Sequence, residues 1–157
     1  MSRNEDTFEV IQAHSLHVDM ITPLFDAYRV FYEREPNLER SRQFLAERIG
    51  VRDTVVFLAV EKNNREEAAL GFVIMYPSFN SIITSPIWIL NDLYVAESAR
   101  RRGVARALIK KAKNLTSATG ARQLILETGA ENTPSHALYE SLGFERDDFF
   151  CTNTVEM

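Results

Sequence analysis

Cysteine is nearly absent from the chain, because Cys151 is the single cysteine among 157 residues. One cysteine cannot form an internal disulfide, and it leaves no cysteine cluster that could bind zinc. His14 and His17 lie close together, but a histidine pair alone is a poor zinc signal. We therefore predict a protein without a metal, and we expect Cys151 to be a buried or inert thiol rather than a nucleophile.

Long apolar runs and an excess of basic residues are also missing. No apolar stretch approaches the length of a transmembrane helix, and residues 1–7 are polar with mixed charge, unlike a signal peptide. These features predict a cytoplasmic protein with no membrane partner. The formal net charge of -4 disfavours nucleic acid as a partner, since nucleic-acid binders usually carry a basic face over a whole domain.

The residues that are present are ordinary for a soluble globular protein, with 45% hydrophobic and 25% charged residues. A length of 157 residues is large enough for a hydrophobic core and is typical of one domain. We therefore expect a single domain over residues 1–157.

The periodicity of apolar residues predicts the order strand, two helices, three strands, helix, strand, helix, and then one or two last strands. The predicted strands cover residues 8–11, 54–61, 68–76, 87–95 and 123–128, with the last one or two in 144–156. The predicted helices cover residues 18–35, 39–49, 104–119 and 134–142. This order is typical of a mixed α/β domain around one central sheet.

Proline and glycine predict several element boundaries. Pro23 falls near the first turn of the first helix, where proline is tolerated, and Gly50 would end the second helix. The polar segment 62–67 predicts the turn of a hairpin. Pro77 and Pro86 bracket either a loop or a distorted extension of a strand.

The most informative stretch runs from Leu90 to Leu108, where a mostly apolar strand passes through a polar turn into an amphipathic helix. Such a turn leaves the first backbone N–H groups of the helix unpaired, and these groups attract an anion together with the helix dipole. Three arginines in the turn add positive charge, and the small Gly103 and Ala105 would let a phosphate approach the backbone. Neither a P-loop nor a G-x-G-x-x-G motif is present, so the usual nucleotide motifs do not explain this turn.

This turn resembles the acyl-CoA-binding motif of the GNAT superfamily of N-acetyltransferases. The resemblance lies in Arg100-x-x-Gly103-x-Ala105 after the strand residues 92–95, since the family consensus is Gln/Arg-x-x-Gly-x-Gly/Ala. A second match follows within 132–144, where the sequence contains NTPSHALY and then LGF. The two motifs in this order are far more specific than either one alone.

The two motifs together span residues 87–144, a little over a third of the chain, while the N-terminal half matches the family only in its general layout. The resemblance implies a GNAT-like fold with a central, twisted and largely antiparallel sheet flanked by four helices. It also implies that the fourth and fifth strands splay apart and hold a thioester between them.

The activity that the resemblance implies is transfer of an acetyl group from the cosubstrate acetyl-CoA to a primary amine by direct attack. The small size of the chain favours a small-molecule amine, and a lysine or N-terminal amine of a protein is the alternative. A non-catalytic acyl-CoA-binding module is a further alternative, which would not need Tyr139. The family is compatible with a homodimer.

The resemblance also assigns residues to acetyl-CoA. The turn and the first helical residues would bind its pyrophosphate: Arg100, Arg101, Arg102, Gly103, Val104, Ala105 and Arg106. Backbone groups of Leu93, Tyr94 and Val95 would pair with the pantetheine arm and polarise the acetyl carbonyl. Asn132 and Ser135 would contact the same cosubstrate, with Asn132 hydrogen-bonding the pantetheine arm.

Three residues are candidates for proton transfer. Tyr139 occupies the family's general-acid position, and a phenol with an ordinary pKa of about 10 is protonated at neutral pH and can donate to a thiolate. Its alternative role is packing on the core face of a helix. Asp92 and Glu127 are the candidate bases, directly or through water, although a water chain can also remove the proton without a single base. The alternative for both carboxylates is a solvated or salt-bridged side chain.

The acceptor pocket is predicted at the first helix. In many small GNAT enzymes the first two helices wall this pocket, and aromatic faces with carboxylates suit a cationic amine. The candidate wall is formed by Tyr28, Phe31, Tyr32 and Glu33, with core packing as the alternative. We expect Tyr28, Tyr32 and Asp92 to contact the amine. Asn91 stands where some polyamine-specific relatives carry an acid, which disfavours a polyamine.

Overall fold

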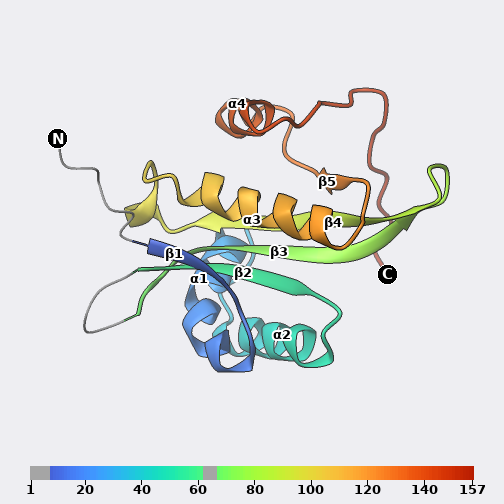
Figure 1. Cartoon of the computed structure of the whole chain (residues 1–157). Coiled ribbons are helices and arrows are strands. Elements are labelled where there is room, and N and C mark those ends of the chain that lie inside the picture. The colour runs from blue at the N-terminus through green and yellow to red at the C-terminus, as the bar shows by residue number, and fades with distance from the viewer. Residues whose placement is uncertain (1–7, 62–66) are drawn as a thin grey trace. The chain divides into compact units, whose positions relative to one another are not determined.

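The structure is a computed structural model that describes residues 8–61 and 67–157 (Figure 1). The chain divides into two compact units, Met1–Glu127 and Thr128–Met157, and each is described by itself. Most of the predicted turn at 62–67 lies outside the described residues.

The first unit is built on a five-stranded sheet in the order β1-β2-β3-β4-β5. Its strands are β1 (Phe8–Gln12), β2 (Val55–Glu61), β3 (Ala69–Asn80), β4 (Ser85–Val95) and β5 (Leu124–Leu126). The first four strands pair antiparallel, and β5 pairs parallel to β4. This mixed, largely antiparallel sheet confirms the predicted fold class.

Helices cover both faces of this sheet. The helices of the first unit are α1 (Val18–Phe31) after the 3₁₀ turn η1 (Ser15–His17), α2 (Leu38–Val51), and α3 (Val104–Ala118) after the 3₁₀ turn η2 (Glu97–Ala99). Figure 1 shows α1 and α2 on one face and α3 on the other. The second unit contains α4 (Thr133–Ser141).

The core of the first unit lies between the sheet and the helices α1 and α2. Its fully buried side chains come from both layers: Ile21, Leu45, Leu58, Phe72 and Ile74. Burying each of these side chains contributes about 1.5–3 kcal/mol to stability. Residues three and four apart share a helix face, so Tyr28 lies on the same face of α1 as the buried Ile21 and Phe25.

The fourth strand contains a β-bulge. Ile74 of β3 pairs with Asp92, and the next residue, Met75, pairs with Leu90. Asn91 is therefore an extra residue in β4. Bulges bend a strand and re-aim its side chains, and they are common next to active sites.

The fourth and fifth strands diverge beyond this bulge. Their parallel ladder ends at the pair Leu90 and Leu126, whereas β4 continues to Val95. The second half of β4 is therefore paired with β3 on one edge and is not in the ladder with β5 on the other. This is the splay of the fourth and fifth strands that the resemblance implied.

Two predictions about the helices are wrong. Gly50 lies inside α2, which ends at Val51, and Arg52 provides the left-handed cap with φ 57°. A helix tolerates an interior glycine at a cost of about 1 kcal/mol, and the packing of α2 in the core outweighs it. Pro23 is the sixth residue of α1 and not part of the first turn.

Two predictions about the strands need correction. The residues around Pro77 and Pro86 extend β3 and β4 into one long hairpin, so the strand extension is confirmed and the loop is wrong. Residues 144–157 contain no strand, although strands were predicted there. A strand needs a neighbouring strand to pair its backbone groups, and the described residues of the second unit contain none. The apolar Phe149 is accordingly 96% exposed, and Cys151, predicted to be buried or inert, is exposed as well.

Candidate active site

A buried carboxylate lies directly after the bulge of β4. Asp92 is only 9% exposed and is held by two donors. The Tyr28 hydroxyl donates to Asp92 Oδ1 at 2.6 Å, and the Asn91 side-chain amide donates to Oδ2 at 3.0 Å. Burial raises the pKa of Asp92 because the charged form loses its hydration, and the two hydrogen bonds offset part of that rise.

The two tyrosines near Asp92 are fixed in their protonated forms. Burial first, and then the hydrogen bond to Asp92, raise the pKa of Tyr28 far above its ordinary value. Burial and the Asp92 charge raise the pKa of Tyr76 to about 12. Tyr28 therefore acts only as a neutral donor to Asp92 at any working pH.

Four aromatic rings gather beside this carboxylate, and we call them the aromatic cluster: Tyr28, Phe31, Tyr32 and Tyr94. The centroid of the Tyr28 ring lies 5.1 Å from that of Tyr32 and 5.9 Å from that of Tyr94. The centroid of the Phe31 ring lies 5.3 Å from that of Tyr32 and 6.3 Å from that of Tyr94. The predicted acceptor residues Tyr28, Tyr32 and Asp92 are thus brought together, beside Phe31 of the predicted aromatic face. The part that the Tyr94 ring plays in this cluster was not predicted.

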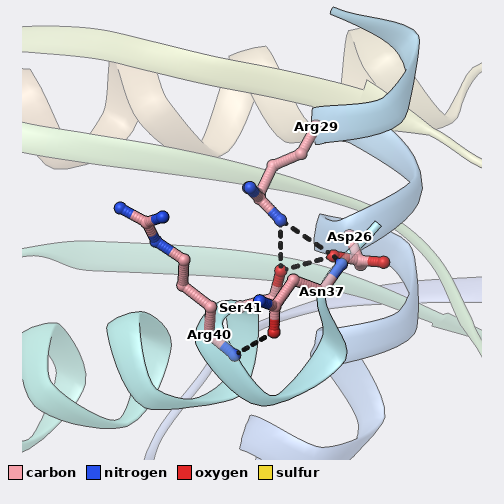
Figure 2. A network of polar contacts seen from close by, with 5 residues as sticks. All are labelled: Asp26, Arg29, Asn37, Arg40 and Ser41. Carbon is pink, nitrogen blue, oxygen red and sulfur yellow. Dashed lines mark hydrogen bonds and ion pairs between the residues drawn. The ribbon is translucent and has the colours of Figure 1, made fainter. Parts of the chain in front are cut away.

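A polar network fixes the end of α1 that carries this cluster. Asp26 Oδ1 accepts hydrogen bonds from Ser41 Oγ at 2.7 Å, from the Asn37 backbone N–H at 3.0 Å and from Arg29 Nη1 at 3.0 Å. Asn37 in turn caps α2 by accepting from the Arg40 N–H at 2.9 Å. Figure 2 shows these five residues joining α1 to the first turn of α2.

The pKa of Asp26 moves in the opposite direction to that of Asp92. Burial alone would raise it, but the bonds from Ser41, the Asn37 N–H and Arg29 outweigh burial and hold it below the ordinary value. Sequence reading missed this network because two of its donors, Ser41 and the Asn37 N–H, come from a different helix and from the connection between the two.

The turn between β4 and α3 has the backbone shape of an anion site. Arg101 and Gly103 both adopt positive φ, 62° and 81°, and α3 begins directly afterwards at Val104. Gly103 is the N-cap residue of α3, and because it has no side chain it supplies no hydrogen bond to the first N–H groups of the helix. Successive N–H groups in such a turn and at a helix N-terminus form a concave anion-binding surface.

The backbone conformation adds a second reason for glycine at position 103. A Cβ on Gly103 would meet nothing within 4 Å, so the protein itself leaves open space there. The positive φ also favours glycine, because a Cβ is strained in that conformation.

Two of the three arginines in this turn are engaged within the protein. Arg100 Nε donates to the Val95 carbonyl at 3.3 Å, and its Cζ lies 5.8 Å from the centroid of the Tyr94 ring. Arg102 Nη2 forms an ion pair with Glu61 Oε1 at 2.9 Å. The expectation that all three arginines supply charge to a phosphate stays a prediction, and the backbone of the turn is a further anion-binding feature.

A glycine that sequence reading overlooked brings α3 close to the sheet. A Cβ on Gly71 of β3 would lie 2.9 Å from the Tyr94 carbonyl oxygen and 3.2 Å from Val104 Cγ1. Real side chains do not tolerate such a contact with backbone, so Gly71 permits the helix to start at this place. A glycine inside a strand pattern was the available signal.

The remaining predicted residues lie after β4 and α3. Glu127 follows β5 and closes the first unit. In the second unit Asn132 caps α4 by accepting from the Ser135 N–H at 3.4 Å, and the Tyr139 ring lies 5.8 Å from that of Phe144. The roles assigned to these residues in acetyl transfer stay predictions.

Within residues 8–61 and 67–157, no group of three or more histidine, cysteine, aspartate or glutamate side chains is arranged to hold a metal ion. No helix in that part of the chain is both long enough and apolar enough to cross a bilayer.

Comparison with known proteins identifies the family. The sequence model of the Acetyltransferase (GNAT) family matches residues 19–144, which run across both units. The uncharacterized N-acetyltransferase YhfO of Bacillus subtilis is 35% identical over 139 residues, covering 88% of this chain and 91% of that protein. The chain therefore belongs to the GNAT family, and it is an N-acetyltransferase.

Solved structures agree with this assignment. The crystal structure of a probable acetyltransferase is 39% identical, with a TM-score of 0.86, and the match covers 95% of this chain and 97% of the other. The aminoglycoside N-acetyltransferase AAC(6')-Iy in complex with CoA matches with a TM-score of 0.79 over 96% and 95% of the two chains. At 22% identity, that second likeness concerns the fold alone.

Proposed function

We propose that this enzyme, acting as one GNAT domain over residues 1–157, transfers the acetyl group of acetyl-CoA to a primary amine of a small molecule by direct attack. The observation that carries the amine half of this reaction is Asp92, a buried carboxylate whose two donors, Tyr28 and Asn91, are both neutral. A buried carboxylate with neutral donors keeps its capacity to attract a cation, because no positive side chain has compensated its charge.

The residues present fit acetyl-CoA, which supplies the acetyl thioester when it is bound. Beyond Leu90 one edge of β4 is free of the ladder with β5, so the backbone groups of residues 93–95 that point to this edge would be available to an extended ligand. The positive-φ turn and the N-terminus of α3, from Arg100 to Arg106, would bind the pyrophosphate. The complex of AAC(6')-Iy with CoA supports the same ligand for this fold.

Asp92 would receive the amine proton. Its raised pKa makes it a stronger base than an exposed aspartate, and its hydrogen bond to Tyr28 fixes its orientation. Glu127 remains the alternative base. In the second unit, Tyr139 would protonate the leaving thiolate, and Asn132 and Ser135 would contact the pantetheine arm, as the second motif implies.

The experiment is an assay of thiol released from acetyl-CoA in the presence of a panel of primary amines, followed by Asp92→Asn on the best acceptor. We expect kcat/KM to fall by about 100-fold or more, the lower end of what a positioned general base contributes. Asp19→Asn is the matched control, since Asp19 is an exposed aspartate paired with Arg42, and it should leave kcat/KM unchanged.

Two outcomes would contradict the proposal. Wild-type kcat/KM in a folded Asp92→Asn variant would remove Asp92 from the chemistry. Thiol release with lysine-containing peptides and with none of the small amines would replace the small-molecule acceptor with a protein amine.

A further inference from the structure

We propose that the acceptor is a monoamine whose single ammonium group is attached to an aromatic or apolar body, and that the aromatic cluster and Arg100 select it over polyamines and aminoglycosides. This inference rests on the function proposed above and names the class of acceptor for the same site. Three features carry it: one carboxylate, a partly exposed wall of rings, and a cation at the far end of that wall.

The carboxylate offers a place for one ammonium. Among the described residues, Asp92 is the only carboxylate that accepts a hydrogen bond from a ring of the aromatic cluster, through the Tyr28 hydroxyl. The acidic side chains that follow α1, Glu33 and Glu35, are exposed, and Arg34 stands between them. A polyamine or an aminoglycoside carries several ammonium groups, and each needs its own anionic partner when it leaves water.

The rings offer apolar surface for the rest of the acceptor. Tyr28, Tyr32, Phe31 and Tyr94 contact one another in a closed cycle, so each ring braces two others. The Phe31 and Tyr32 side chains are nevertheless 62% and 58% exposed. Large rings that are held in place yet remain exposed provide binding surface at low conformational cost.

Arg100 places a positive charge beside the Tyr94 ring of the aromatic cluster, and this charge disfavours a second ammonium there. Asp92 and Tyr94 are two residues apart on β4, so their side chains leave the same face about 7 Å apart. The guanidinium of Arg100 lies 5.8 Å from the centroid of the Tyr94 ring. An acceptor whose ammonium binds Asp92 and whose body lies on these rings reaches the Tyr94 ring, where the positive charge of Arg100 repels a second ammonium.

The test compares kcat/KM for 2-phenylethylamine, spermidine and kanamycin in the thiol-release assay at saturating acetyl-CoA. We expect 2-phenylethylamine to exceed the other two by about tenfold or more, the range that an apolar pocket achieves between related substrates. Equal or higher kcat/KM for spermidine or kanamycin would overturn this inference and leave the proposed function intact. If none of the amines produced thiol release from acetyl-CoA, the proposed function itself would be contradicted.

Two variants identify the source of the preference. Tyr32→Ala removes an exposed ring and should lower kcat/KM for 2-phenylethylamine about tenfold, with little change for spermidine. Arg100→Gln should raise the ratio of kcat/KM for spermidine to kcat/KM for 2-phenylethylamine. Both values are measured at saturating acetyl-CoA, so a loss of acetyl-CoA affinity leaves this ratio unchanged. Phe79→Ala removes an 83% exposed ring from the β3–β4 hairpin and is the matched control, for which the ratio should stay at its wild-type value. A wild-type ratio in both Tyr32→Ala and Arg100→Gln would overturn the assignment.

Discussion

Asp26 and Asp92 are two aspartates buried in the same unit, 6% and 9% exposed, and their surroundings give them opposite properties. Asp26 accepts from a guanidinium, a hydroxyl and a backbone N–H, whereas Asp92 accepts only from a phenol and a side-chain amide. The pKa of Asp26 is lowered and that of Asp92 is raised. A buried carboxylate with a charged partner stabilises the fold, and one with neutral partners stays able to bind a cation or a proton.

The two carboxylates also affect stability over pH with opposite signs. Asp26 has a folded pKa below its unfolded value, so its contribution is present above the unfolded pKa and is lost as pH falls through the folded pKa. Asp92 has a folded pKa above its unfolded value. The folded state then binds the proton more tightly, and stability decreases as pH rises from the unfolded to the folded pKa.

Asp26→Asn tests the structural half of this comparison and should have the largest effect on stability. Removing the charge leaves the Arg29 guanidinium without its acceptor in a mostly buried place, so we expect a loss of about 3 kcal/mol in the free energy of unfolding. The measurement is urea unfolding at neutral pH. Asp19→Asn, at the exposed pair with Arg42, should cost about 0.5 kcal/mol or less. Equal losses in the two variants would remove the distinction between buried and exposed partners.

Tyr28→Phe tests the proposed role of Asp92 in catalysis. The bond from Tyr28 stabilises the charged form of Asp92, so its loss should raise the pKa of Asp92 and move the acid limb of the pH–rate profile to higher pH. We also expect kcat/KM to fall about tenfold, corresponding to one hydrogen bond to a charged group of roughly 1.5 kcal/mol. Tyr76→Phe is the control in the same core and should leave the acid limb in place. A shift of equal size in both variants would mean that the Tyr28 hydrogen bond has no special role.

Arg29→Gln makes the Asp26 site resemble the Asp92 site, because it replaces the charged donor with a neutral one. The free energy of unfolding should fall by about 1 kcal/mol, and acid unfolding should begin at higher pH because the pKa of Asp26 rises. Both quantities come from unfolding curves recorded over a pH series. An unchanged acid limit would show that Ser41 and the Asn37 N–H are sufficient to hold the low pKa.

Asp92→Asn should have the smallest effect on stability. The amide oxygen still accepts from Tyr28, and the cost of burying a charge disappears, so the variant should be as stable as the wild type at low pH and more stable at neutral pH. The difference should be smaller than the roughly 3 kcal/mol expected at Asp26. Unfolding free energies of the two proteins over the pH series provide the check. A large loss of stability at neutral pH would place Asp92 in the same class as Asp26.

Much of the fold could be predicted from local patterns. The strands β1 and β2, the helix α3 and the motif from Arg100 to Ala105 were recognisable because their apolar period or residue spacing is contained in a short segment. The end of α2 was predicted wrongly at Gly50, since a helix ends where its packing ends and not at each glycine. The strands expected in 144–156 failed because a strand forms only when a neighbour pairs with it.

The sequence by itself determined the family and the order of the elements, since motif spacing and hydrophobic period are local properties of the chain. Only the tertiary structure decided which buried aspartate has a charged donor and which has neutral donors alone. Tyr28 reaches Asp92 across 64 residues, and Ser41 reaches Asp26 across 15 residues. A pKa depends on the donors, the charges and the burial around a group, and folding alone brings these together.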